Sequence, residues 1–283
     1  MLDSQSFPNQ LRTRIAIRFL LCITTTLALV FVFRTEIIWS EMHGVLLLGT
    51  LAFVSAAFIH AFATTCFRDA MVLLIAAVTI GAAMEYSSLS WRFPFGAHYR
   101  YHPDLPQVFA LPWFIPLSWY ALSAVPLVFL RSYEVRNRGL SHRVLKSFLC
   151  AIVLTSGDLL LDPLAVSFEA WQWKPAGPYY GVPLENFLGW LITGFVIYFV
   201  YFSVDSGRLR SGTQHWDDEY ALIVFGMTLV AWVAAWVRLS GLQTMFLFWL
   251  TTTTPFVIYW WTHRSKDTHA RNGQGIRQTA NDR

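Results

Sequence analysis

The sequence predicts an all-α integral membrane protein, built as a polytopic bundle of about eight (seven to eight) transmembrane helices. Of its 283 residues, 55% are hydrophobic and only 13% are charged, whereas soluble domains carry about 25% charged residues. The apolar residues come in blocks of about 20, the length that a helix needs to cross a hydrocarbon core about 30 Å thick. Both observations favour one helical membrane domain over soluble domains.

The apolar blocks define the predicted spans in chain order. They cover residues 15–34, 45–65, 69–89, 108–130, 145–165, 183–204, 220–238 and 242–262. The first block lacks a small-residue cleavage site after it, so we expect a retained helix rather than a signal peptide. Residues 1–14 then form the N-terminus, residues 15–262 a single transmembrane domain, and the polar residues 263–283 a disordered tail.

Lysine and arginine residues set the predicted orientation. They gather in residues 131–146 and in the tail, which lie on the same side as the N-terminus if eight spans are present. The positive-inside rule then places both termini in the cytoplasm, and we expect the membrane to be a bacterial inner membrane. The loops 85–106 and 165–183 consequently share the opposite, non-cytoplasmic face.

Four acidic residues are predicted to meet at this non-cytoplasmic boundary. Glu85 ends the third span, Asp158 and Asp162 lie near the end of the fifth, and Glu185 begins the sixth. A charged side chain near a bilayer centre costs about 2.5 kcal/mol or more, so such residues are candidates for function. Asp158 and Asp162 are four residues apart and therefore share one helix face.

The paired aspartates suit proton transfer. Two carboxyl groups this close in a low-dielectric setting cannot both ionise cheaply, so one can act as an acid and the other as a base. Pro163 should also free a backbone carbonyl nearby, which could hold water. Each acid also has a structural alternative. The aspartates could only bond Ser, Tyr or Trp groups across helices, Glu85 could pair with Arg92 or Arg100, and Glu185 could cap a helix N-terminus.

Aromatic residues crowd the two loops. Most of them match the Trp and Tyr belts found at membrane interfaces, but desolvated aromatic faces also stabilise cations by about 2 kcal/mol. The loops therefore predict a pocket that could protonate an alkene and shelter the resulting carbocation.

The sequence predicts no metal and no cofactor. His98 and His102 are four residues apart, but no further ligands accompany them, whereas a zinc site needs three or four protein ligands. No phosphate-binding motif occurs. The net charge of +4 comes largely from loops between spans and does not indicate a nucleic-acid partner.

Two sequence blocks carry a family resemblance. The first contains EY, PFG and PLSW, and the second contains DP, W-x-W and YYGVPLENFLGW. Together they span residues 85–190, about the middle third of the chain, and resemble the membrane-bound carotenoid hydratases of the bisanhydrobacterioruberin hydratase and γ-carotene hydratase type.

The resemblance implies addition of water across the terminal double bond of an acyclic carotenoid ψ-end, without a cofactor. Its implied partners are the carotenoid in the bilayer, water and membrane lipid, and association with other carotenoid enzymes is a further option. Asp158 and Asp162 are then the expected acid and base, in an order left open, with Glu85 assisting. The expected substrate-binding residues are Trp171, Trp173, Tyr179, Tyr180, Asn186, Phe95, Tyr99 and Glu185.

The chain departs from the family pattern at Ser88, Trp91 and Arg92, where the pattern has a Gly, a Thr and a second Gly. We expect these three positions to lie in the pocket. Two other interpretations stay open. A carotenoid cyclase of the lycopene type, or another isoprenoid-cation enzyme, would capture the same cation with an internal alkene, whereas a transporter or receptor would distribute charged residues through several spans.

Overall fold

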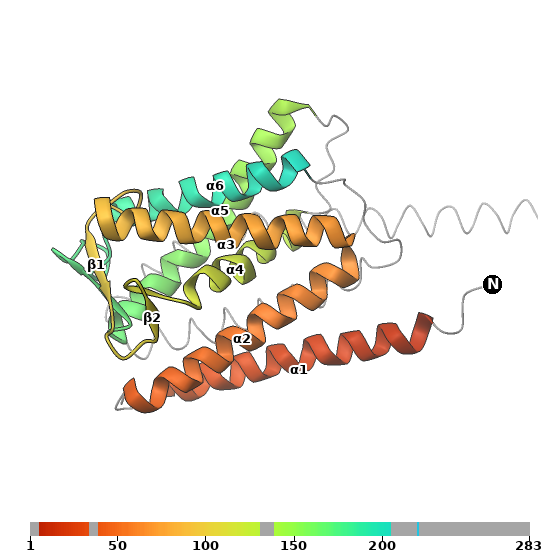
Figure 1. Cartoon of the computed structure of the whole chain (residues 1–283), viewed down its shortest axis with the longest axis horizontal. Coiled ribbons are helices and arrows are strands. Elements are labelled where there is room, and N and C mark those ends of the chain that lie inside the picture. The colour runs from red at the N-terminus through yellow and green to blue at the C-terminus, as the bar shows by residue number, and fades with distance from the viewer. Residues whose placement is uncertain (1–5, 34–38, 131–138, 205–219, 221–283) are drawn as a thin grey trace, which may run out of the picture.

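The computed structural model describes residues 6–33, 39–130, 139–204 and Tyr220 (Figure 1). Within these residues the chain is mostly helical, and short strands lie together at one end of the helices. The helices are α1 (Ser6–Phe33), α2 (Trp39–Thr64), α3 (Phe67–Trp91), α4 (Ile115–Leu130), α5 (Leu140–Ser167) and α6 (Leu184–Val204).

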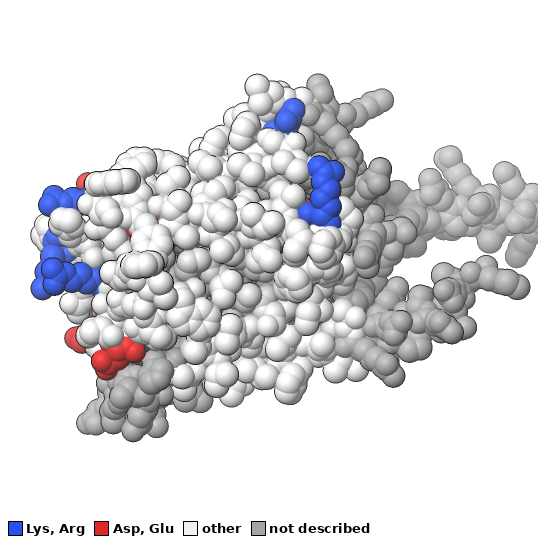
Figure 2. All heavy atoms as spheres, in the orientation of Figure 1, with Lys and Arg blue, Asp and Glu red and all other residues white. Residues whose placement is uncertain are grey.

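Four of the described helices are long and apolar enough to cross a membrane: residues 44–64 of α2, and the whole of α3, α5 and α6. Helix α4 is apolar but has only 16 residues, which gives a length of about 24 Å. Figure 2 shows Lys and Arg at both ends of one face, with a broad uncharged band between them. The chain is therefore a helical membrane protein.

The predicted fourth span, 108–130, does not begin as a helix. Strands β2 (Gln107–Val108) and β3 (Leu111–Pro112) first form an antiparallel hairpin, whose turn residues Phe109 and Ala110 both have positive φ. Pro112 has no N–H for a helical hydrogen bond and favours this break. Helix α4 starts only at Ile115, so the prediction was wrong over its first seven residues.

The described helices support a helical membrane protein but not the predicted count of seven to eight spans. Two predicted spans, 220–238 and 242–262, and the predicted tail lie outside the described residues, apart from Tyr220. Helix α1 begins at Ser6, earlier than the predicted start at residue 15.

Small residues allow the helices to approach closely. Helices α5 and α6 pack together, and α3 contacts both α4 and α6. A Cβ atom on Gly194 of α6 would stand 3.4 Å from the Cα atom of Ala151 on α5. Close contact of this kind is typical of membrane helices, whose association depends on packing rather than on hydrophobic burial.

The two motif loops meet in a two-stranded sheet. Strand β1 (His98–Tyr101) pairs with β4 (Trp171–Lys174) in antiparallel register, with Tyr99 opposite Trp173. Side chains alternate across a strand, so Tyr99 and Trp173 are buried while Arg100 and Lys174 are exposed. Loops 85–106 and 165–183 thus lie at the same end of the helices (Figure 1).

Candidate active site

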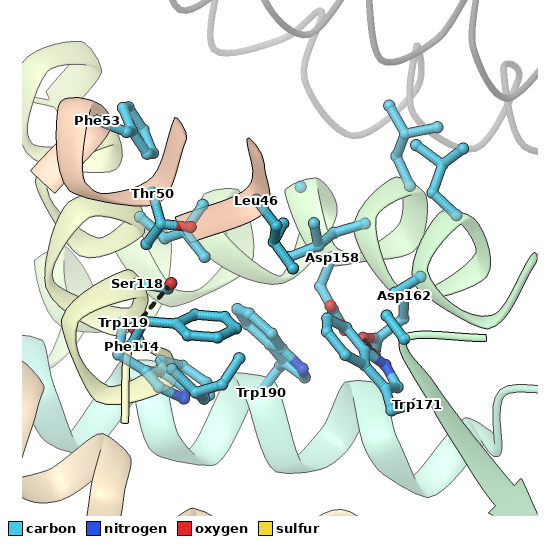
Figure 3. Close-up of a pocket in the computed structure, with 18 of the residues that line it drawn as sticks. Leu46, Thr50, Phe53, Phe114, Ser118, Trp119, Asp158, Asp162, Trp171 and Trp190 are labelled. Carbon is cyan, nitrogen blue, oxygen red and sulfur yellow. Dashed lines mark hydrogen bonds between the residues drawn. The ribbon is translucent and has the colours of Figure 1, made fainter. Parts of the chain in front are cut away.

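A cavity of about 460 Å³ lies among the helices and against the β1–β4 sheet. Its lining is predominantly apolar, yet Glu85, Asp158 and Asp162 all contribute to it. In the view of Figure 3, the two aspartates project from α5 beside Trp171, and Leu46 and Thr50 of α2 border the opposite part of the cavity. Three carboxyl groups from two helices therefore meet in one largely apolar space.

Glu85 is held by three donors and by no arginine in the described part of the chain. The Nε1–H of Trp119 donates to Oε1 over 2.9 Å, and the hydroxyls of Tyr99 and Tyr101 both donate to Oε2. The side chain is only 6% exposed. A carboxylate is an acceptor-only group when ionised, so this arrangement suits an ionised Glu85 as a fixed anion.

The tyrosine donors keep their protons near neutral pH. Burial, followed by the negative charge of Glu85, raises the pKa of Tyr99 and that of Tyr101 well above the ordinary value of a phenol. Both hydroxyls therefore act as hydrogen-bond donors to Glu85.

Asn186 connects the two aspartates. Its Nδ2 donates to Oδ2 of Asp158 over 3.1 Å and to Oδ2 of Asp162. The Nε1–H of Trp171 donates to Oδ1 of Asp162 over 3.1 Å. Both carboxyl groups are at most 3% exposed, and Oδ2 of each contacts the same Asn186 nitrogen. The predicted spacing on one helix face thus places them side by side.

The carbonyl that Pro163 leaves without a helical partner is that of Leu159, four residues earlier. The hydroxyl of Tyr179 donates to this oxygen over 2.9 Å. Helix α5 consequently continues through Pro163 to Ser167, and a tyrosine takes the position that we expected water to occupy.

Indole rings form part of the cavity wall. Trp119 of α4 and Trp190 of α6 lie with their ring centroids 4.2 Å apart, and Phe95 stacks on Trp119 at 6.1 Å. Trp119, Trp190 and Tyr101 were not predicted as site residues. The signal was present, since Trp119 and Trp190 end the PLSW and NFLGW motifs.

Five of the predicted substrate-binding residues line the cavity, and three do not. The lining residues are Phe95, Tyr99, Trp171, Trp173 and Asn186. Tyr179 instead binds the Leu159 carbonyl, and Tyr180 has a positive φ of 52° in the following turn. Glu185 is exposed in the first turn of α6, one residue before the inward-facing Asn186.

The expectation that Ser88, Trp91 and Arg92 lie in the pocket is wrong, because none of them lines it. The buried Ser88 Oγ accepts the backbone N–H of Phe95 over 2.9 Å, while Trp91 is 78% exposed. Arg92 caps α3 with a φ of 65°, a left-handed conformation that favours glycine. These positions shape the turn after α3 rather than the cavity.

No group of three or more His, Cys, Asp or Glu side chains that could hold a metal ion occurs among the residues described above. Donors from Trp, Tyr and Asn are instead the partners of the three carboxyl groups.

Comparison with known proteins gives a consistent result. The family model described as carotenoid biosynthesis protein matches residues 42–258, a range that contains the whole cavity apart from its α1 residues. The bisanhydrobacterioruberin hydratase of Haloarcula japonica is 34% identical over 192 residues, which cover 65% of this chain. The match spans 59% of that relative's own length. No solved structure matches the chain significantly.

Proposed function

The chain belongs to the carotenoid biosynthesis protein family, and from this premise we propose that it is a carotenoid hydratase, which adds water across the terminal double bond of an acyclic end group. The observation that carries this proposal is the pair of buried aspartates joined by Asn186 in a predominantly apolar cavity. The name of the Haloarcula japonica relative supports the same reaction.

The apolar lining and the volume of the cavity support a hydrocarbon substrate. Away from the carboxyl groups, its walls are apolar side chains such as Leu46 and Phe53 of α2, Val125 of α4 and Leu154 of α5. A cavity of this size is within the range of about 300–1,000 Å³ for small-molecule sites. We propose that the end group reaches the aspartates while the polyene follows the apolar walls.

The reaction requires a proton, a stabilised cation and a water molecule. One aspartate protonates the alkene, which leaves a tertiary carbocation. The fixed negative charge of Glu85 and the faces of Trp171 and Trp173 stabilise this cation. Water then bonds to the tertiary carbon, and the second aspartate removes the surplus proton. The sum is an alkene and water giving a tertiary alcohol, with no change of redox state.

Expression in a lycopene-producing bacterium tests the proposal. A hydratase yields pigments heavier by one or two waters, whereas a cyclase yields pigments of unchanged mass. The purified protein in detergent, given an acyclic carotene in ¹⁸O-labelled water, should form a labelled tertiary alcohol. An unlabelled alcohol, or a pigment of unchanged mass at full membrane abundance, would contradict a hydratase.

Matched variants connect the activity to the cavity. Asp162→Asn should lose at least a hundredfold in turnover, because an amide cannot exchange the proton and general acid–base catalysis contributes about 10²–10⁴-fold. The control is Asp104→Asn, which makes the same chemical change at an exposed position outside the cavity. Equal turnover in the two variants would remove the aspartates from the reaction.

We further propose that both termini are cytoplasmic, in a bacterial inner membrane, with the β1–β4 sheet on the opposite face. The concentration of Lys and Arg in residues 131–146 supports this orientation. A reporter fused after Arg138 should read cytoplasmic, and one inserted near Ala176 should read external. The reverse pattern would place the sheet at the cytoplasmic side.

A further inference from the structure

The two aspartates differ in how their oxygens are satisfied. Asp162 has a donor on each oxygen, from Trp171 on Oδ1 and from Asn186 on Oδ2. Asp158 has a donor on Oδ2 only, again from Asn186. Its Oδ1 is fully enclosed and meets no hydrogen-bond donor among the described residues. As a carboxylate, Asp162 would have a hydrogen-bond donor on each oxygen, whereas Asp158 would have a donor on one oxygen only.

This asymmetry decides which carboxyl group keeps a proton. An ionised carboxylate buried with a bare oxygen loses its hydration without replacement, which is strongly unfavourable. A proton on Asp158 removes that charge, whereas a proton on Asp162 would replace an acceptor oxygen that Trp171 or Asn186 already uses. The hydrogen bonds thus favour a neutral Asp158 beside an ionised Asp162.

Glu85 does not compete for the role of acid. Its two oxygens accept three donors, from Tyr99, Tyr101 and Trp119, so its hydrogen bonds also favour the ionised form. Among the three carboxyl groups in the cavity, Asp158 has the one oxygen without a donor.

We propose that Asp158 is the proton donor to the alkene and that Asp162 is the base that receives a proton from water. This assignment rests on the proposed hydratase function. The O–H bond of Asp158 breaks as a C–H bond forms on the terminal alkene, and the cation forms at the tertiary carbon. Water bonds to that carbon and gives one proton to Asp162. The proton then passes from Asp162 to Asp158, since Oδ2 of each carboxyl group lies within hydrogen-bonding distance of the same Asn186 nitrogen, and the pair returns to its starting state.

Asn186 is a positioning residue in this scheme. Its amide touches Oδ2 of both aspartates, which fixes the distance between donor and base. Trp171 supplies the asymmetry, since it donates to Asp162 alone.

Infrared spectroscopy of the purified protein tests the assignment without any substrate. A protonated carboxyl group has a C=O band that a carboxylate lacks, and difference spectra between wild type and variant isolate one residue. Asp158→Asn should remove one such band, whereas Asp162→Asn and Glu85→Gln should retain it. Any other pattern, including a band lost on Asp162→Asn, would overturn the assignment. Thermal melting in the same detergent confirms that each variant is folded.

Deuterium labelling tests the same roles during the reaction. In D₂O, Asp162→Asn should return carotene carrying deuterium at the CH carbon of its terminal double bond, because Asp158 still adds a deuteron to that carbon and takes a proton back from it while the cation is not captured. Asp158→Asn should give neither deuterium nor alcohol. Deuterium with Asp158→Asn, or none with Asp162→Asn, would overturn the proposal. A wild-type protein that forms no alcohol would instead refute the hydratase function, and the infrared result would stand independently.

Discussion

Gly81→Ala should break the contact between Trp119 and Glu85 through a single added methyl group. A Cβ atom at Gly81 would stand 2.6 Å from Cγ of Trp119 and 2.8 Å from Cδ1. Restoring ordinary contact requires the indole to move away from α3 by roughly 0.8 Å, and Glu85 lies one turn further along the same helix face. The hydrogen bond from Trp119 to Glu85, now 2.9 Å, would then exceed the range of about 2.7–3.2 Å.

The expected cost has two parts. Overpacking a tight interior costs about 1–3 kcal/mol, and a lost hydrogen bond to a charged group costs about 1.5–3 kcal/mol. The gain in helix propensity from Gly to Ala offsets about 0.5–1 kcal/mol, so the net destabilisation should be about 2–5 kcal/mol. The control is Gly44→Ala in α2, where an added Cβ meets nothing within 4 Å.

Equilibrium unfolding in detergent measures the difference between the two glycine variants, and turnover is measured on the same samples. Gly81→Ala should be destabilised and slow, whereas Gly44→Ala should match or slightly exceed the wild type in stability. Equal free energies of unfolding for the two variants would contradict the prediction, because they would mean that the Trp119 indole moves aside without cost.

Three further predictions address other parts of the site. Asn186→Leu keeps the side-chain volume but removes the amide that joins Asp158 to Asp162. Turnover should fall at least a hundredfold. A wild-type rate would contradict a role for the Asn186 amide. Arg92→Gly should stabilise the protein by about 1 kcal/mol in the same unfolding assay, since a residue at φ 65° is strained unless it is glycine, and turnover should be unchanged because Arg92 does not line the cavity. Finally, the pKa of Tyr99 and that of Tyr101 are raised in the folded protein, so the unfolded state loses these protons first as the pH rises. The free energy of unfolding should therefore fall above about pH 10, by at most about 1.4 kcal/mol per pH unit for each tyrosine. Tyr101→Phe should make that slope shallower, and an unchanged slope would contradict the burial of this hydroxyl.

Hydropathy predicted the long helices because length and composition are sufficient for them. Predicted spans 45–65, 69–89, 145–165 and 183–204 correspond to α2, α3, α5 and α6 within a few residues. The same criterion failed at 108–114, where apolar residues serve a hairpin instead of a helix. Leu111 and Phe114 are buried there while Phe109 is 86% exposed, and an average over a window cannot separate these cases.

Residue spacing predicted that Asp158 and Asp162 share a helix face, since positions four apart are neighbours on any α-helix. Spacing could not show that Asn186 rather than Glu185 points to them. Successive residues on a helix differ by about 100°, so only one of two neighbours can face the cavity. Choosing between them needs the rotation of α6, which depends on packing against α5.

The pairing of β1 with β4 joins segments about 70 residues apart, and no local rule gives its register. A clue was nevertheless present in the alternation of HYRY and WQWK, since period-two patterns are typical of strands with one buried face. This sheet brings Tyr99 and Tyr101 to Glu85, and Trp171 to Asp162. A prediction confined to helices could therefore name the carboxyl groups but not their donors.

The distribution of these donors along the chain bears on how the protein enters the bilayer. Every donor to Glu85 lies between Tyr99 and Trp119, in the part of the chain that is synthesised before α5. Both donors to the aspartates, Trp171 and Asn186, lie after α5 begins. Each half of the chain thus carries the hydrogen-bond donors for its own buried carboxyl groups, and the pairing of β1 with β4 sets those donors in place. Docking of the two halves then adds apolar packing, the pairing of β1 with β4 and hydrogen bonds such as that from the Tyr198 hydroxyl to the Ser123 carbonyl, and the cavity is the space that this docking leaves between them.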